Sequence, residues 1–312
     1  MNGRPVPVPP TGRQIELRAG DAVAVVTEVG ASVRVLRLGG HDVLDGVRTG
    51  EPEFGGQGQV LVPWPNRLAD GRYRFGGQDL QLPLTEPERG NAIHGLGRFL
   101  AWEVVETATD RARLRLFVAP QPGYPFALEV DVEHVLDPSG LTVRTTGRNI
   151  GGAELPFGSG AHPYLTAGTP TIDDSLLQVA AGGRLLADER GIPTGERAAT
   201  AGTEYDFSTP RPIGAMHLDT AFGDLARDDE GRATVRLRAP AGAGVDLWLD
   251  EHHAYLMLFT GDTLSPAQRR RRALAVEPMT CAPNAFQTGD GLRTLAPRAS
   301  LTCAWGIRVA AD

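Results

Sequence analysis

The chain lacks lysine, has few cysteines and contains no long apolar run. All 31 basic residues are arginine, which we attribute to coding bias in a GC-rich genome. Cys281 and Cys303 make neither a metal-ligand set nor a disulfide framework, although a single bridge between them stays open. The net charge of −7 leaves no basic footprint for nucleic acid, so we expect no nucleic-acid partner.

No segment approaches the roughly 20 apolar residues of a membrane span. The first 14 residues also lack the apolar region of a signal peptide. We therefore expect a cytoplasmic protein with no membrane association. The sequence does not choose between a monomer and a homodimer.

Helical periodicity over ten or more residues is also scarce, whereas short alternating runs recur, for example at 33–38, 128–136 and 141–148. The 39 glycines and 24 prolines favour turns. Parallel strands need long crossovers, so strands that follow one another without helices predict antiparallel sheets. We predict an all-β fold, one large and mostly antiparallel β-sandwich domain over residues 14–312, after a loose tail at residues 1–13.

A glycine-rich segment near the middle of the chain, GSGAHPY at 158–164, presents a histidine. Gly158 and Gly160 leave space beside the backbone, and Pro163 pushes His162 towards an extended conformation. Histidine exchanges protons near neutral pH, and Tyr164 lies two residues on. The alternative is a buried histidine satisfied by the backbone.

Three further segments carry polar side chains suited to a ligand. Two prolines stiffen the chain before Asn66 and Arg67, and His94 lies in the glycine-rich turn GNAIHGLGR. Asp219 lies among apolar neighbours, and a carboxylate can accept hydrogen bonds from two hydroxyls at once. Taken singly, each segment also fits a structural role, as a surface ion pair, a core histidine or a turn cap.

Glu277 is the strongest single candidate for a general base. It ends an apolar, strand-like run and precedes Pro278, so partial desolvation should raise its pKa towards the useful range. The four arginines just before this run, at 269–272, are interpreted as a solvated loop, with a phosphate contact as the alternative.

In this order, the segments that contain Asn66-Arg67, His94-Gly95, His162-Pro163-Tyr164, Asp219 and Glu277-Pro278 resemble the aldose 1-epimerase (mutarotase) family, over about residues 54–286. The resemblance implies a large β-sandwich, often called a supersandwich, that interconverts the α and β anomers of a free aldose without metal or nucleotide. It implies Glu277 as the general base and His162 as the general acid. Arg67, His94 and Asp219 would hold the sugar, with Asn66 and Tyr164 beside them.

Two positions depart from the family pattern. Leu165 stands where many relatives have phenylalanine, and Asn284 where aspartate is common. Both bear on substrate identity more than on reaction type. Three alternatives remain: a glycoside hydrolase using Glu277 with Asp219, a hexose-phosphate 1-epimerase with a cationic pocket, and a sugar-binding protein without catalysis. The expected partner is a monosaccharide, with no cofactor.

Overall fold

The computed structural model describes residues 8–53 and 55–310, and it is built almost entirely of strands. Strands make up 48% of it and helices 3%. Every pairing between its named strands is antiparallel. The predicted all-β, mostly antiparallel fold is confirmed.

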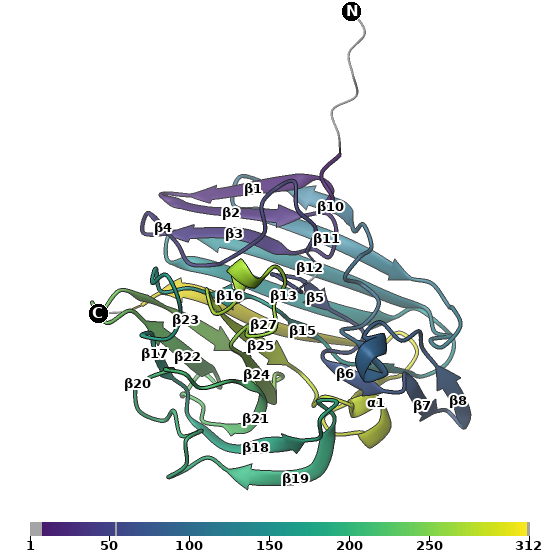
Figure 1. The fold of residues 1–312 in the computed structure, drawn as a ribbon. Coiled ribbons are helices and arrows are strands. Elements are labelled where there is room, and N and C mark those ends of the chain that lie inside the picture. Colours follow the sequence, from purple (N-terminus) through teal and green to yellow (C-terminus); the bar gives the residue numbers. More distant parts are fainter. Residues whose placement is uncertain (1–7, 54, 311–312) are drawn as a thin grey trace, which may run out of the picture.

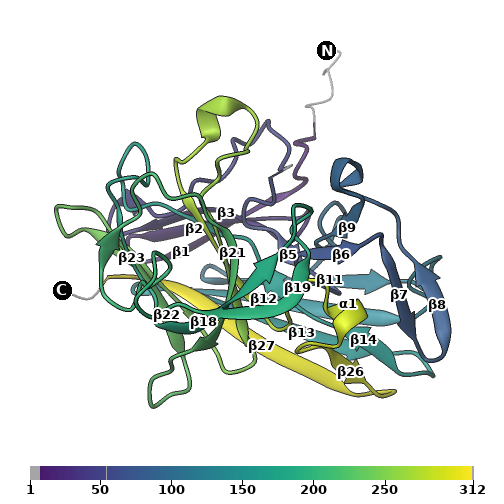
Figure 2. The ribbon, with the colours of Figure 1, turned by 60° about the horizontal axis from the view of Figure 1, so that its bottom comes forward.

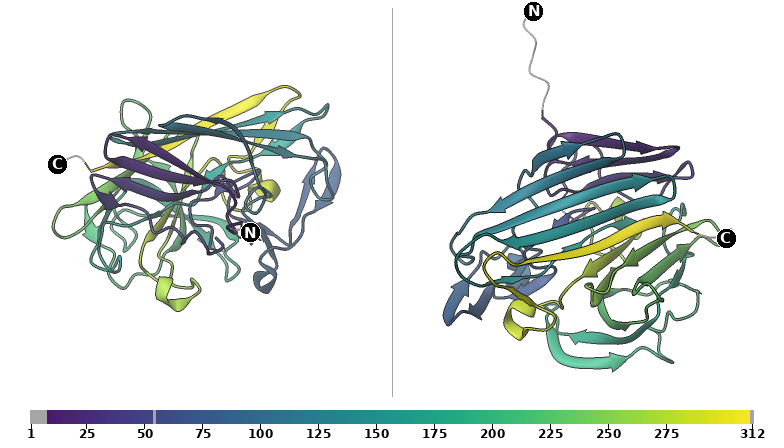
Figure 3. Two further views of the ribbon diagram at one scale, coloured as in Figure 1. Left: turned by 90° about the horizontal axis from the view of Figure 1, so that it is seen from above. Right: turned by 180° about the vertical axis from the view of Figure 1, so that it is seen from behind.

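The larger sheet has nine strands, and its long members form the back of the molecule (Figure 3). In β12, inward and outward residues alternate, and the register with β13 is unbroken from Leu128 opposite Asn149 to Asp137 opposite Gly140. Alternation of this kind buries one face of each strand. In spatial order the strands are β10 (Glu103–Thr107), β11 (Arg111–Val118), β12 (Leu128–Asp137), β13 (Gly140–Asn149), β27 (Ser300–Val309), β23 (Gly244–Leu249), β22 (Ala233–Arg238), β17 (Leu176–Gln178) and β20 (Arg211–Pro212).

The second sheet has eight strands and carries Tyr164, Asp219 and Glu277. Its central strand β25 is buried at all six positions, so a charged residue there is desolvated. The order is β19 (Pro193–Ala199), β18 (Ala181–Ala187), β21 (Asp219–Leu225), β24 (Tyr255–Phe259), β25 (Leu274–Met279), β15 (Gly160–Ala161) and β5 (Val60–Leu61), while β16 (Tyr164–Leu165) also pairs with β25 (Figure 1).

Smaller elements complete the molecule (Figure 2). A four-stranded sheet contains β1 (Gln14–Ala19), β2 (Ala22–Thr27), β3 (Val33–Leu38) and β4 (His41–Asp42). Three strand pairs are β6 (Arg67–Ala69) with β9 (Asn91–Ile93), β7 (Arg72–Phe75) with β8 (Gln78–Gln81), and β14 (Leu155–Phe157) with β26 (Arg293–Leu295). The short helices are η1 (Pro87–Arg89), η2 (Ala267–Arg269) and α1 (Ala285–Thr288).

One hydrophobic core joins the two large sheets. Val132 and Leu247 of the nine-stranded sheet and Leu258 of the eight-stranded sheet belong to the same cluster and are fully buried. Burial of this apolar surface between facing sheets is what makes a sandwich stable. Leu165 lies in this core as well, at 0% exposure. Both cysteines, Cys281 and Cys303, are free and buried.

The N-terminal tail was expected at residues 1–13, of which residues 1–7 lie outside the described part. Thr11 is buried, and its carbonyl accepts a hydrogen bond from the Val29 amide at 3.1 Å. Within the described residues, buried packing therefore begins at Thr11, three residues before the first strand. Among residues 8–53 and 55–310, the helices are too short to span a membrane.

Candidate active site

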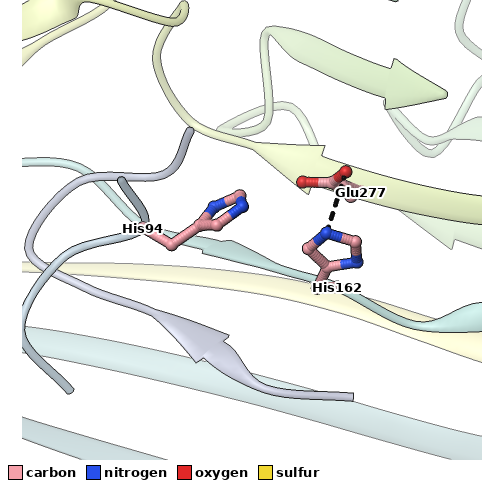
Figure 4. A group of neighbouring side chains, drawn as sticks. All are labelled: His94, His162 and Glu277. Atoms are coloured by element: carbon pink, nitrogen blue, oxygen red, sulfur yellow. Dashed lines mark ion pairs between the residues drawn. The ribbon is translucent and has the colours of Figure 1, made fainter. Parts of the chain in front are cut away.

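The first two residues of the site come from adjacent strands of the eight-stranded sheet. Glu277 lies in β25, and His162 directly follows β15, its neighbour. Gly160 permits this close pairing, because a Cβ at that position would lie 2.8 Å from Pro65 and 3.0 Å from the Pro278 carbonyl. As a result, Nε2 of His162 lies 3.3 Å from Oε1 of Glu277, with both side chains almost fully buried (Figure 4).

The imidazole of His162 is held between aromatic and backbone surfaces. It stacks on the Tyr164 ring, with centroids 5.0 Å apart and an interplanar angle of 13°. The Tyr164 hydroxyl donates to the Gly55 carbonyl at 3.0 Å. A Cβ on Gly56 would lie 2.8 Å from Cδ2 of His162, so the absence of a side chain at Gly56 allows the loop to pack on the ring. The orientation of His162 is therefore fixed before a ligand arrives.

His94 and Asn66 are joined across the β6–β9 pair. Both residues have positive φ, 63° and 58° respectively, a conformation in which asparagine and histidine occur more often than most side chains. The backbone amide of Asn66 donates a hydrogen bond to Nδ1 of His94 at 3.1 Å. Because Nδ1 of a neutral imidazole accepts here, Nε2 carries the proton, and His94 can donate a hydrogen bond to a ligand.

Arg67 is fixed by two acidic residues. Its Nε donates to Oε2 of Glu86 at 3.0 Å, and its Nη1 lies 3.4 Å from Oδ2 of Asp219. The Arg67 side chain is 10% exposed and that of Asp219 is 39% exposed, so Asp219 keeps access to solvent and to ligands. The guanidinium therefore reaches the site already oriented.

All seven residues that the sequence analysis proposed for the site line one cavity of about 400 Å³. Three of them, His94, His162 and Glu277, lie close together in it (Figure 4). The other four predicted residues are Asn66, Arg67, Tyr164 and Asp219. A cavity of this size with converging polar groups is typical of small-molecule sites.

Part of the cavity wall, above all Arg98, was not predicted from the sequence. This residue is buried, lines the cavity, and donates from Nε to Oε1 of Gln59 at 2.7 Å. It lies four residues after His94 in the same glycine-rich segment, so that segment contained the signal. Glu86 had no such signal, because its role as the partner of Arg67 depends on tertiary contact alone. The remaining wall includes Glu88, Phe99, Phe259 and Leu264.

Burial shifts the protonation of the central pair in opposite directions. Desolvation raises the pKa of Glu277 well above its ordinary value, and nearby Asp219 raises it further, against the opposing effect of Arg67 and Arg98. Desolvation lowers the pKa of His162 to about 3, and the charge of Arg98 contributes to the decrease. Without a ligand, the carboxyl of Glu277 therefore tends to hold the proton and the imidazole of His162 is neutral.

His94, His162 and Glu277 also form the one group of potential metal ligands in the described residues, with ligand atoms within 4.8 Å of one another. For Nε2 of His94 to bind a metal ion, its proton would have to move to Nδ1, which would break the hydrogen bond that Nδ1 accepts from the Asn66 backbone amide, or the imidazole would have to lose that proton altogether. The positive charges of Arg67 and Arg98 also lower the pKa of His94, so they disfavour a further positive charge beside this imidazole. This donor set suits hydrogen bonding to hydroxyl groups better than a cation.

The two departures from the family pattern have different locations. Leu165 belongs to the hydrophobic core and does not line the cavity. Asn284 supports the site from behind, because its Oδ1 accepts from the Ala69 amide at 3.1 Å and its own backbone amide donates to the Arg67 carbonyl at 2.7 Å. Asn284 therefore holds the strand that presents Arg67.

The interpretation of residues 269–272 as a solvated loop is wrong for two of its arginines. Arg269 donates to the Gly46 carbonyl at 2.7 Å, and its side chain is only 13% exposed. Arg271 donates to Asp173 and Asp262, each at 2.7 Å. These two arginines are partly buried because they donate hydrogen bonds to carboxylates and carbonyls from other segments of the chain. None of the four arginines lines the cavity.

Comparison with known proteins agrees with this geometry. The family model for aldose 1-epimerase matches residues 13–305. The chain belongs to the aldose 1-epimerase family. Membership in this family implies an isomerase. A structure of a GalM/aldose epimerase homologue from C. elegans has the same fold. Its TM-score is 0.85, over 96% of this chain and 98% of that chain, at 17% sequence identity.

Two relatives show the range within the family. The chain is 34% identical to the uncharacterized protein YihR of Escherichia coli, over 91% of this chain and 89% of that protein. It is 28% identical to maltose epimerase of Levilactobacillus brevis, over 74% of this chain and 73% of that enzyme. The relatives of this chain thus include an enzyme named for a disaccharide.

Proposed function

We propose that this protein is a cofactor-independent aldose 1-epimerase that interconverts the α and β anomers of a free reducing sugar. The observation that carries the proposal is the buried contact of 3.3 Å between Nε2 of His162 and Oε1 of Glu277 in a polar cavity. Ring opening needs one proton acceptor and one proton donor, and this pair offers one of each.

The proposed reaction conserves protons at each step. The base removes the proton from the anomeric hydroxyl while the acid protonates the ring oxygen; the C1–O5 bond breaks and the C1 carbonyl forms. Rotation about C1–C2 then exposes the other face of the carbonyl. Closure returns the proton from the ring oxygen and reprotonates O1, with the two groups in exchanged roles. Glu277 serves as base and His162 as acid in the opening direction.

Sugar binding would prepare this protonation state. A carboxylate that accepts hydrogen bonds from hydroxyl groups is favoured in its ionised form, and Arg67 and Arg98 already favour that form of Glu277. The shared proton then moves to His162, which becomes the donor. Arg67 and the donor nitrogen of His94 would stabilise negative charge on the opening ring, and Asp219 would accept from sugar hydroxyls.

The charge around the cavity favours a sugar without phosphate over a hexose phosphate. Four carboxyl groups, those of Glu86, Glu88, Asp219 and Glu277, line it beside two arginines. Arg67 is already paired with Glu86 and Asp219. The arginines at 269–272 lie outside the cavity, so they do not supply a phosphate pocket there. Glycoside hydrolysis is disfavoured because it gives His162 no part, although His162 contacts Glu277.

The test is polarimetric relaxation of freshly dissolved α-D-glucose and α-D-galactose, with wild type beside His162→Ala. We expect the wild type to accelerate relaxation of at least one sugar, and the variant to lose the acceleration. If no free aldose, including acidic sugars, is accelerated, the proposal fails. Sugar binding without acceleration would then indicate a non-catalytic sugar-binding protein.

A further inference from the structure

A second cavity adjoins the site on the side of Asp219. It measures about 290 Å³ and shares Asp219 with the first cavity, while Arg89, Leu185, Ala187, Glu189 and Gly191 form other parts of its wall. The strand order explains the adjacency, since β25 with Glu277, β21 with Asp219 and β18 with Leu185 follow one another across the sheet, with only β24 between the first two (Figure 1).

This arrangement extends the site crosswise over the strands. Three strand spacings of about 4.8 Å separate β25 from β18, so the strands that carry Glu277 and Leu185 lie on the order of 14 Å apart. Such a length exceeds one pyranose ring. In a pyranose, C4 lies opposite C1. A ring with C1 at Glu277 and its far hydroxyls at Asp219 therefore directs a substituent on O4 towards the second cavity.

The wall of the second cavity is built and fixed. The turn between β18 and β19 is held by Arg190, whose Nη2 donates to the Gly90 carbonyl at 2.9 Å and to Asp70 at 2.8 Å. Gly191, with φ of 76°, lies against the Arg67 guanidinium so closely that a Cβ would be 2.6 Å from Nη1. Arg89 reaches from the η1 side, with its Nη1 3.8 Å from Oδ2 of Asp219.

The chemistry of this wall fits a neutral ring with hydroxyl groups. Leu185 and Ala187 offer a small apolar surface, and Arg89 and Glu189 offer a donor and an acceptor. Three carboxylates outnumber two guanidinium groups along the wall, so an anionic substituent is disfavoured. Resting on the proposed function, we propose that the second cavity binds a neutral glycosyl unit linked to O4 of the reducing sugar, and that extended reducing sugars are preferred substrates.

The test compares maltose with glucose by polarimetry, using wild type and Ala187→Trp. Ala187 is exposed at the end of β18 and lines the second cavity, so the indole would occupy the space of the second ring. Ala199→Trp is the matched control, because Ala199 is exposed on the neighbouring strand β19 and lines neither cavity. Ala187→Leu gives a graded step if the larger substitution impairs folding.

We expect the wild type to have a higher kcat/KM for maltose than for glucose. In Ala187→Trp, kcat/KM for maltose divided by kcat/KM for glucose should fall by about fivefold or more, because KM for maltose rises. In Ala199→Trp this ratio should equal that of the wild type. Glucose acceleration with no preference for maltose, or an unchanged ratio in Ala187→Trp and Ala187→Leu, would overturn the inference alone. No acceleration of any sugar would overturn the proposed function and the inference together.

Discussion

His162 and Glu277 differ from ordinary histidine and glutamate because both are buried in one cavity. Burial disfavours the charged form of each, so the pKa of Glu277 rises and that of His162 falls to about 3. Between these two values the pair holds one proton in total, which is the state that ring opening requires. The two groups titrate as a coupled pair rather than as separate residues.

The pH dependence of kcat/KM follows from these shifts. Activity should be lost on acidification only when His162 and Glu277 are both protonated, near the lowered pKa of His162, and lost on alkalinisation above the raised pKa of Glu277. We therefore expect no loss of kcat/KM as the pH falls from about 7 to about 5, after subtraction of the spontaneous rate. A tenfold fall around pH 6.5, as for an unperturbed histidine, would contradict this account.

Several site residues could be predicted singly because their local sequence is unusual. His162 before Pro163 and Glu277 before Pro278 are examples, and both reach the cavity. Their chemical state was less predictable. The sequence predicts a partly desolvated carboxylate at Glu277, and the family resemblance implies a general acid at His162, whereas burial of both groups favours the neutral pair until a ligand binds. Depth of burial is a tertiary property, which local sequence does not specify.

The loop at residues 55–58 is the element that positions His162. The Gln59 carbonyl, just after it, accepts from the His162 amide at 3.1 Å, and Gly56 lies against the imidazole. Gly56 has φ of 85°, a conformation that side chains rarely adopt. Both its conformation and its contact with the ring therefore require glycine.

Gly56→Ala should displace the imidazole of His162 while the protein stays folded. A reacting group displaced by a few tenths of an ångström to 1 Å loses roughly 10- to 100-fold in kcat. Gly77→Ala is the matched control, because Gly77 has φ of 79° but a Cβ added there would meet no atom within 4 Å. Both variants carry a similar backbone cost, of about 1–2 kcal/mol. Equal loss of kcat in the two variants would show that the ring contact is irrelevant.

The long strands were predictable because one face of each is buried. Residues 128–136 alternate in sequence and form β12, with alternate residues buried. Short elements such as β15 and β16, each two residues long, have no period to detect. The arginine run at 269–272 was misinterpreted for a related reason, because its partners Asp45, Asp173 and Asp262 are not its immediate neighbours in the chain.

For the molecule as a whole, the strand framework supports residues that are distant in sequence. Asp219 and Glu277 come from two strands of the eight-stranded sheet, and Arg67 comes from β6 of the separate β6–β9 pair. No periodicity predicts that such residues converge, and only the order of motifs, through its resemblance to the aldose 1-epimerase family, indicated it. The fold, the family and the shared cavity now agree. The role of each residue in catalysis stays a prediction.

In the proposed reaction, Glu277 is the group that exchanges the proton of the anomeric hydroxyl. Glu277→Gln keeps the shape of the side chain and removes its ability to accept and release a proton. Polarimetry with an accelerated sugar, combined with calorimetric binding of that sugar, tests the claim directly. If Glu277 is this group, kcat should fall by at least about a thousandfold, with sugar affinity within a few-fold of wild type. Wild-type-like acceleration by Glu277→Gln would contradict it.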